Sequence, residues 1–504
     1  MIPDKETLLL GIDIGTTGAK CAVYNLKCEI VAHAYQEYAM IHPEANWAEQ
    51  DPHLWWNAVS NNLQDCFTRQ KINSAQIASV GVSCTNAIVL VDKDGNPVYN
   101  AIGLHDQRAD AQVEWLREHV GEDYILKTTA NRLAKGSFSL PSLRWLIDNR
   151  PELVKAAHKF LMPSGFIIQK LTGVFAINRP RMNLTLLSDV RTGEWCKETV
   201  TKAQIPQRLL PASYDVCDIV GTVSASAAAA TGLRAGTPVT AGCMDTVIAT
   251  AASGAVNVGD MAITIGSSGR ICYISEKPVY DTRILTCHSA FNNSYTLVQT
   301  TDNAGISLRW FRDVFGAAIV QDAQKAGVSV YQYMDQLAQN ASAGAGGLLY
   351  LPYLSGEKSP IWNTKARGVF FGAGLNTEYR DFVRAVMEGV AFSIRDCMSI
   401  LIENATSPDV IPLGGGAASS QVWCQIFADV LNCKILRLKA NETETLGDII
   451  AAAQSVGIKE VPYDFGKTIA EQGELLLPNL QNTILYDMQF AKYKKLYASI
   501  KDMF

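Results

Sequence analysis

The chain has 504 residues, of which 48% are hydrophobic and 18% are charged. This composition is typical of a folded globular protein, and at roughly 100–200 residues per domain the length predicts two to four domains. The 44 basic and 49 acidic side chains give a formal net charge of −5. Proteins that bind nucleic acids or anionic membranes carry an excess of positive charge, so neither partner is expected.

The cysteines and histidines argue against two further classes of protein. The 12 cysteines never form a C-x-x-C pair, and the 7 histidines never occur at the H-x-x-x-H spacing of zinc enzymes. The first residues lack the basic region of a signal peptide, and no stretch approaches the roughly 18 apolar residues of a membrane helix. We therefore expect a soluble, cytoplasmic protein with reduced cysteines.

The first half of the chain predicts strands followed by helices. The expected elements are strands at 8–12, 19–24, 30–39, 77–83 and 87–91, then a largely helical region at 110–173. Asp51 and Pro52 predict the start of a helix between the third and fourth strands, because Asp is a favoured N-cap and Pro a favoured first helical residue.

The second half opens with the same arrangement as the first. Residues 239–242 predict a buried strand that stops at a glycine, and we place the domain boundary just after it, near residues 245–258. Strands at 260–265 and 270–274 then flank the turn Gly266-Ser267-Ser268-Gly269. In both halves a turn of glycines and hydroxyl residues joins two strands, although no sequence repeat is visible.

The segment 11–20, Gly-Ile-Asp-Ile-Gly-Thr-Thr-Gly-Ala-Lys, is the strongest functional signal. Its glycines let the backbone approach a ligand, and the hydroxyls of Thr16 and Thr17 can donate to phosphate oxygens. Asp13, at the end of the strand, is suited to hold a hydrated Mg²⁺. The spacing matches neither G-x-G-x-x-G nor the P-loop, and a purely structural hairpin is the alternative.

Two other turns and one carboxylate are further candidates. The turn 266–269 could clamp a polyphosphate from the second lobe, and glycines in the turn 414–420 could let a base or ribose lie flat against them. Both turns could instead serve only close packing. Asp245 follows a strand end, where a carboxylate can take a proton from a substrate hydroxyl, cap the following helix, or do both.

In this order, these segments resemble the FGGY carbohydrate kinases, within the superfamily of actin, sugar kinases and heat-shock ATPases. The resemblance covers roughly residues 7–455 and rests on the segment 13–20, Trp-Ala-Glu-Gln-Asp-Pro at 47–52, Ala-Gly-Cys-Met-Asp at 241–245, 266–269, Gly-Val-Phe-Phe-Gly at 368–372, Arg-Ala-Val-Met-Glu-Gly at 384–389, and 414–420. It implies an α/β fold of two actin-like (ribonuclease H-like) lobes, 1–248 and 249–504, with mixed sheets flanked by helices around a deep cleft. It also implies ATP-dependent transfer of the γ-phosphate to a terminal hydroxyl of a small sugar or polyol, with Mg²⁺ as cofactor.

The resemblance also implies roles for individual residues. Asp245 would be the general base, and Asp13 would hold Mg²⁺ through water, with Asp245 as a further candidate ligand. The first hairpin would bind phosphates through Gly15, Thr16, Thr17, Gly18 and Lys20. The residues expected to bind the rest of the nucleotide are Gly266, Ser267, Gly305, Arg309, Gly415, Gly416 and Ser420.

The expected acceptor site departs from the family pattern. Xylulose kinases of the family have Gln-Met-His-Gly where this chain has Cys84-Thr85-Asn86-Ala87, and glycerol kinases have Arg-Glu at Thr85 and Asn86. We expect Thr85, Asn86 and Asp106 to contact a polyhydroxylated substrate, whereas an ion pair of Asp106 with Arg108 that braces a loop is the alternative. A carboxylate substrate would require an extra cation, which the sequence does not identify.

The predicted acceptor is therefore D-xylulose or D-gluconate, and another pentulose or alditol, such as ribulose or L-xylulose, is the alternative. A rival from another class is a nucleotide-dependent sensor, which would need a partner-binding appendage that this sequence does not suggest. An inactive scaffold would require a broken phosphate hairpin or the loss of Asp245. The resemblance also makes a homodimer the expected assembly.

Overall fold

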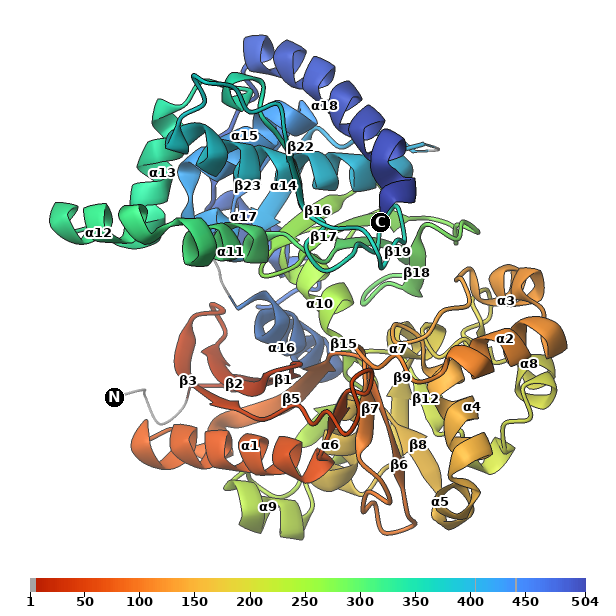
Figure 1. Ribbon diagram of the computed structural model, residues 1–504. Coiled ribbons are helices and arrows are strands. Elements are labelled where there is room, and N and C mark those ends of the chain that lie inside the picture. Colours follow the sequence, from red (N-terminus) through yellow and green to blue (C-terminus); the bar gives the residue numbers. More distant parts are fainter. Residues whose placement is uncertain (1–5, 404, 440–441) are drawn as a thin grey trace. The chain divides into compact units, whose positions relative to one another are not determined.

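The computed structural model describes residues 6–403, 405–439 and 442–504 (Figure 1). By internal contacts the chain divides into two compact units, and neither is continuous in sequence. The first unit contains Met1–Ala252, Ser275–Thr296 and Glu442–Gly466, and the second contains Ser253–Ile274, Leu297–Asn441 and Lys467–Phe504. The division of the chain at residues 248 and 249 into two continuous lobes stays a prediction.

A mixed sheet forms the centre of the first unit. Its strand order is β13-β14-β5-β1-β2-β3, and β15 also pairs with β5. The strands are β1 (Leu8–Ile14), β2 (Gly18–Asn25), β3 (Ile30–Glu37), β5 (Ile77–Cys84), β13 (Ile219–Thr222), β14 (Pro238–Thr240) and β15 (Cys243–Met244). Strands β1, β2 and β3 form the predicted antiparallel meander, and β1 is buried along its whole length.

Helices cover both faces of this sheet (Figure 1). Helices α1 (Pro52–Gln64) and α6 (Pro163–Thr172) lie on one face, and α16 (Thr443–Ser455) lies on the other, beside α10 (Asp245–Ala252). The α1 start confirms the prediction, because the Asp51 side chain accepts a hydrogen bond from the His53 N–H. Helix α16 lies very close to the strands: a Cβ on Gly81 would be 2.1 Å from the Asp448 carbonyl oxygen, so only glycine fits there.

The remaining elements of the first unit form smaller layers around this core. Its four-stranded sheet runs β4 (Glu49–Gln50), β7 (Ala101–Gly103), β6 (Ala87–Val91), β8 (Lys159–Leu161). The other strands of these layers are β9 (Ala176–Asn178), β10 (Ser188–Asp189), β11 (Glu194–Trp195) and β12 (Ala212–Tyr214), and β18 (Leu285–His288) lies at the edge of a separate seven-stranded sheet. The other helices are α2 (Asp110–His119), α3 (Glu122–Thr129), α4 (Ser139–Asn149), α5 (Pro151–Ala156), α7 (Arg179–Asn183), α8 (Lys197–Lys202) and α9 (Ala225–Thr231).

The second unit also contains a mixed sheet flanked by helices. Its strands follow the order β19 (Tyr295–Thr301), β17 (Gly269–Ser275), β16 (Met261–Ile265), β22 (Val410–Gly414), β23 (Lys434–Arg437), β24 (Glu474–Leu476). The other elements are α11 (Gly305–Phe315), α12 (Ala317–Ala326), α13 (Val330–Asn340), β20 (Leu349–Leu351), β21 (Val369–Phe371), α14 (Tyr379–Leu401), α15 (Gln421–Leu431), α17 (Phe465–Glu471) and α18 (Leu480–Ile500). Strands β16 and β17 form the predicted hairpin, and two sheets flanked by helices confirm the α/β fold class.

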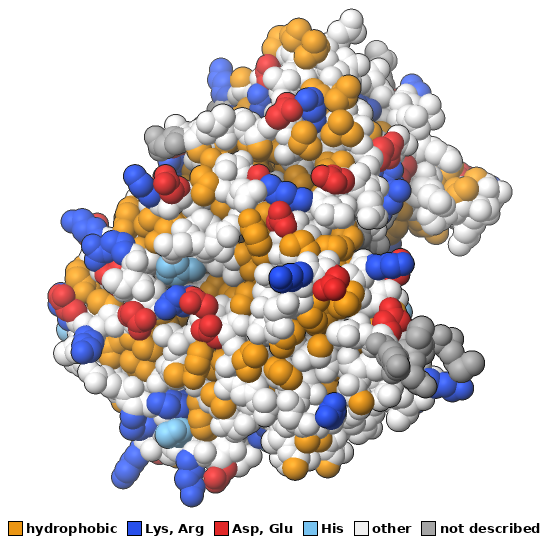
Figure 2. Space-filling model, turned by 180° about the vertical axis from the view of Figure 1, so that it is seen from behind, with side chains coloured by type: hydrophobic (Ala, Val, Ile, Leu, Met, Phe, Trp, Pro, Cys, Tyr) orange, Lys and Arg blue, Asp and Glu red, His pale blue; other side chains and the backbone are white. Residues whose placement is uncertain are grey.

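Three properties of the chain as a whole bear on its function. None of the 12 cysteines, all of which lie in the described ranges, forms a disulfide, in agreement with the expected reduced state. Within the described ranges, no helix combines the length and the apolar character that a membrane span needs. On the face drawn in Figure 2, basic and acidic side chains are interspersed, and neither sign forms a continuous patch among the described residues.

Candidate active site

The carboxyl ends of three neighbouring parallel strands gather the predicted residues of the first unit. Strand β5 pairs in parallel with β1 and with β15, so that Ser83 lies opposite Asp13 on one side and Cys243 on the other. Thr85 and Asn86 directly follow β5, and Asp245 directly follows β15. Residues at the carboxyl ends of adjacent parallel strands meet at one edge of a sheet, which is the usual position of a ligand site in α/β folds.

The turn between β1 and β2 is held in place from several sides. The Gly15 N–H donates to the Gly18 carbonyl at 3.0 Å, and the Tyr38 hydroxyl donates to the Gly15 carbonyl at 2.6 Å. The Thr16 hydroxyl lies 3.2 Å from the Thr85 hydroxyl, which joins the turn to the end of β5. The Thr17 side chain is exposed. The turn therefore holds its hydroxyl groups in a fixed conformation, as a phosphate-binding hairpin requires.

Asp13 is a buried carboxyl in an acidic surrounding. Burial, followed by the charges of Glu444 and Asp245, raises the pKa of Asp13 from 3.8 to about 7, against the opposing effect of Lys20. A carboxylate that is destabilised by burial and by like charges would be stabilised by a cation. The surroundings of Asp13 therefore fit the hydrated divalent ion expected there, and its binding stays a prediction.

Ser83 links Asp13 to a carboxyl that the sequence analysis missed. Its hydroxyl lies 3.0 Å from Asp13 Oδ1 and 2.9 Å from Asp448 Oδ2. One hydroxyl has one proton, so it can donate to only one carboxylate at a time. Burial raises the pKa of Asp448 well above its ordinary value, so a protonated Asp448 can donate to Ser83 while Ser83 donates to Asp13.

Lys20, predicted to bind phosphate, is engaged by an acidic side chain in this structure. Its ammonium group lies 3.0 Å from Glu442 Oε2. Burial lowers the pKa of Lys20, but the charges of Glu442 and Glu444 outweigh it and the net shift is upward. Lys20 therefore stays charged beside the hairpin, and a phosphate would have to compete with Glu442 for it.

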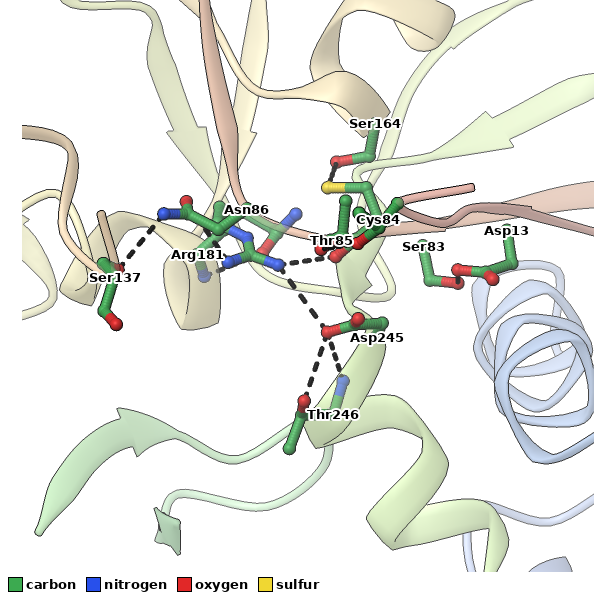
Figure 3. Close-up of polar contacts among 12 residues, drawn as sticks. Asp13, Ser83, Cys84, Thr85, Asn86, Ser137, Ser164, Arg181, Asp245 and Thr246 are labelled. Atoms are coloured by element: carbon green, nitrogen blue, oxygen red, sulfur yellow. Dashed lines mark hydrogen bonds and ion pairs between the residues drawn. The ribbon is translucent and has the colours of Figure 1, made fainter. Parts of the chain in front are cut away.

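Asp245 has one occupied and one open oxygen. Its Oδ1 accepts hydrogen bonds from the Thr246 N–H at 2.6 Å and from the Thr246 hydroxyl at 3.2 Å (Figure 3). The Arg181 Nη2 atom lies 3.8 Å from the same Oδ1. These contacts hold the carboxylate at the first residue of α10, and they leave Oδ2 available.

Arg181 connects the residues around Asp245, and the sequence analysis did not identify it. Its side chain is 1% exposed, and Nη2 donates to the Cys84 carbonyl at 2.5 Å while Nη1 lies 3.4 Å from Asn86 Oδ1 (Figure 3). The Asn86 side chain in turn donates to the carbonyl groups of Gly136 and Ser137, at 3.1 Å each. Asn86 thus holds the neighbouring loop, and Arg181 supplies a cation beside the expected acceptor residues.

Asp106 and Arg108 form a buried ion pair. The Arg108 Nη2 atom lies 2.7 Å from Asp106 Oδ2 and 2.8 Å from Glu49 Oε1, and the side chains are at most 2% exposed. Asp106 Oδ2 also accepts the Ala48 N–H at 2.7 Å, and the Arg108 guanidinium lies 3.7 Å from the centre of the Trp47 ring. This geometry fits the alternative in which the pair braces a loop.

Four of the predicted nucleotide residues of the second unit lie close together around the end of β16: Gly266, Ser267, Gly305 and Gly415. The Gly305 N–H donates to the Gly266 carbonyl at 2.9 Å, and the Ile306 N–H donates to the Ser267 carbonyl at 3.1 Å. A Cβ on Gly305 would lie 2.4 Å from the Gly266 oxygen, and one on Gly415 would lie 2.6 Å from the Ile265 oxygen. Helix α11 and the turn after β22 therefore both pack directly against this hairpin, and both contacts require glycine.

Ser420 begins α15 and faces a carboxylate that the sequence analysis missed. Its hydroxyl accepts the Trp423 N–H at 3.1 Å and donates to Asp335 Oδ1 at 2.7 Å. Burial raises the pKa of Asp335. Gly416 belongs to the same turn, whereas Arg309 is an exposed residue of α11. The turn is thus glycine-rich on its strand side and polar where the helix begins.

Comparisons with known proteins give matches over most of the chain. Residues 8–252 match the N-terminal domain of the FGGY family of carbohydrate kinases, and residues 261–456 match its C-terminal domain. A xylulose kinase from Bacillus subtilis is 28% identical over 98% of this chain and 97% of its own, and a gluconokinase from Bacillus licheniformis is 27% identical over 89% and 88%. The crystal structures of a gluconate kinase and a ligand-bound xylulose kinase, both from Lactobacillus acidophilus, each have a TM-score of 0.89 at 26% identity, over 98% of both chains.

Proposed function

Because the chain belongs to the FGGY family of carbohydrate kinases, it is a phosphotransferase that acts on an alcohol group of a sugar or sugar acid, and we propose that its acceptor is D-xylulose or D-gluconate. The transfer would go from ATP to the terminal hydroxyl of that acceptor. The observation that carries the proposal is the grouping of Asp13, Thr85 and Asp245 at the carboxyl ends of β1, β5 and β15. This edge combines a base, hydroxyl donors and the phosphate hairpin.

In the proposed reaction Asp245 acts as the general base. It takes the proton of the terminal hydroxyl as that oxygen bonds to the γ-phosphorus, and the bond from this phosphorus to the bridging oxygen of ADP breaks. The hydroxyl and N–H groups of Thr16, Thr17 and Gly18 would stabilise the charge on the phosphoryl oxygens. Mg²⁺, held through water by Asp13 and also near Asp245, would neutralise phosphate charge.

We assign nucleotide binding in the second unit to the predicted residues around β16. These residues are Gly266, Ser267, Gly305, Arg309, Gly415, Gly416 and Ser420. Gly266 and Gly416 are exposed, so a nucleotide can approach the backbone at these two positions with no side chain between them.

The site is compatible with two classes of acceptor, because the positive charge of Arg181 offsets the negative charge of Asp245. Without it, an anionic acceptor whose terminal hydroxyl faces Asp245 would approach an unopposed negative charge. With the guanidinium 3.8 Å from Asp245, both a neutral ketose and an aldonate are compatible with the site. The family relatives named above include kinases for each class.

The proposal is tested by measuring ADP release from Mg-ATP with a panel of ketoses, alditols and aldonates. We expect one strong responder, either D-xylulose or D-gluconate, with no release in its absence. A stronger response to ribulose or L-xylulose would replace the proposed acceptor, and ATP binding without any response would contradict the assignment. The expected cytoplasmic location and homodimer stay predictions, and sedimentation of the purified protein would test the dimer.

A further inference from the structure

The guanidinium of Arg181 is buried beside a carboxylate at the edge of the sheet where the predicted site lies. It is 1% exposed, and its Nε–H has no hydrogen-bond partner among the described residues. Burying a charged group costs free energy unless it is paired and fully hydrogen-bonded, and a buried ion pair contributes little net stability. The position of Arg181 therefore calls for an explanation.

We propose that Arg181 is the positioning residue of the phosphoryl transfer, holding Oδ1 of Asp245 so that Oδ2 is left to accept the proton of the acceptor hydroxyl. This inference rests on the proposed function of Asp245. It concerns a residue that acts through Asp245 and Asn86, since its own burial keeps it from the acceptor.

The contacts of Asp245 support the distinction between its two oxygens. The Thr246 N–H, the Thr246 hydroxyl and the Arg181 guanidinium all lie on the Oδ1 side, at 2.6, 3.2 and 3.8 Å. No hydrogen bond to Oδ2 is found among the described residues. A carboxylate held by one oxygen has a fixed orientation, and orientation of a base toward the reacting hydroxyl is worth a large factor in rate.

Arg181 is itself fixed by groups from separate parts of the first unit. Helix α7 carries its backbone, the Cys84 carbonyl at the end of β5 accepts from Nη2, and Asn86 faces Nη1. Through Asn86 the network reaches the carbonyl groups of Gly136 and Ser137 (Figure 3). Arg181 thereby sets the position of Asp245 relative to the residues expected to contact the acceptor.

Arg181→Met tests the proposal, with Arg181→Lys and Arg179→Met as matched variants. Methionine keeps much of the length of the side chain but removes the charge and the donors, whereas lysine keeps the charge. Arg179 is on the same short helix, is 34% exposed and pairs with Asp215 at 2.5 Å and Glu194 at 3.8 Å, away from Asp245. It controls for the loss of an arginine from α7.

We expect Arg181→Met to lower kcat about 100-fold while the KM for ATP changes by less than about twofold, because a misplaced base slows chemistry without removing the nucleotide site. Arg181→Lys should recover part of kcat, and Arg179→Met should match the wild type. Circular dichroism and the thermal midpoint identify variants that fail to fold. If Arg181→Met does not fold, the kcat of Arg181→Lys is measured instead, both with and without added guanidinium.

A double variant separates positioning from a general structural effect. If Arg181 acts through Asp245, adding Arg181→Met to Asp245→Asn should lower the residual kcat much less than it lowers the wild-type value. An equal loss in both backgrounds, or a folded Arg181→Met variant with wild-type kcat, would overturn the proposal. Full activity of Asp245→Asn alone would instead overturn the proposed function, so the two failures are distinguishable.

Discussion

Asp245 lies at the first residue of α10 with Oδ1 held by Thr246, so asparagine can keep the size and most contacts of the side chain while removing the proton acceptor. We expect Asp245→Asn to lower kcat by about 10²–10⁴-fold, the usual contribution of a general base. ATP binding should persist, because the substitution leaves the proposed nucleotide residues of the first hairpin and of the second unit unchanged. Calorimetric titration with ATP and coupled ADP release measure the two quantities separately, and wild-type turnover would remove Asp245 from its role.

Glu357 gives a pH prediction that concerns stability. Its carboxylate accepts hydrogen bonds from the Thr301 hydroxyl and the Asp302 and Lys358 N–H groups, but burial raises its pKa from 4.5 to about 8. Between these values the folded state binds more protons than the unfolded state, so this group makes the free energy of unfolding fall as the pH rises, by up to about 1.4 kcal/mol per pH unit.

Glu357→Gln removes the titrating carboxyl group. The glutamine amide can still accept hydrogen bonds from the Asp302 and Lys358 N–H groups and donate one to the Thr301 hydroxyl. Relative to the wild type, the variant should therefore gain stability as the pH rises from 5 to 8. Urea unfolding at several pH values measures the difference between the two proteins. Parallel curves would show that Glu357 does not titrate in this window.

The predicted site residues and the missed ones differ in the signal that they leave in the sequence. Asp13 lies at the end of a buried strand, and Thr16 and Asp245 follow such strands, all within a few residues of glycine; this local pattern is visible without a structure. Arg181 and Asp448 reach the site from other elements through contacts that join residues 97 and 365 positions apart. No local sequence pattern indicates such long-range contacts, so Arg181 and Asp448 could be assigned to the site only from the fold.

At the level of elements, the close packing of α16 on β5 can be tested with one methyl group. Gly81→Ala would place Cβ 2.1 Å from the Asp448 carbonyl oxygen, and this backbone atom cannot rotate away. We expect a loss of about 1–3 kcal/mol in the free energy of unfolding, together with a lower kcat, because a shift of α16 displaces Asp448 from Ser83.

Gly374→Ala is the matched control for this substitution. A Cβ there meets nothing within 4 Å, and Gly374 is not among the glycines with positive φ. Its unfolding free energy should stay within about 0.5 kcal/mol of the wild type. Chemical denaturation of the three proteins makes the comparison, and equal stability of Gly81→Ala and Gly374→Ala would contradict the packing described here.

Some elements of the fold could be predicted from the sequence, and others could not. The meander of β1, β2 and β3, the hairpin of β16 and β17, and the start of α1 follow from apolar runs bounded by glycine, hydroxyl or Asp-Pro signals. The return of residues 442–466 to the first unit was not predicted, because it depends on the fit of α16 against bare glycine backbone in strands more than 360 residues earlier.

For the whole molecule, the burial of the cysteines predicts a simple labelling result. Ten of the 12 thiols are buried, and only Cys196 and Cys217 are partly exposed. Burial raises the pKa of Cys217 to about 12. Burial also acts to raise the pKa of Cys196, but hydrogen bonds from Thr199 outweigh this effect and lower the pKa of Cys196. Since thiolates are the reactive form, we expect one fast-reacting thiol per native chain.

Labelling with a thiol reagent at neutral pH, before and after denaturation, measures this. One thiol should react quickly in the native protein and all 12 in denaturant. The Cys196→Ser variant should lose the fast phase. Several fast-reacting thiols in the folded wild type would show that the units open more readily than their packing indicates.

Helix α16 has a consequence for how the protein is made. It covers β1 and β5, yet it belongs to a segment that ends at Gly466 of a 504-residue chain. A ribosome releases the N-terminal strands long before this helix exists, so a nascent chain must carry an uncovered apolar sheet face through most of its synthesis. We expect chaperones to bind arrested nascent chains that end before residue 442 and to leave the released full-length chain, because the first unit can reach its native state only after residues 442–466 have left the ribosome.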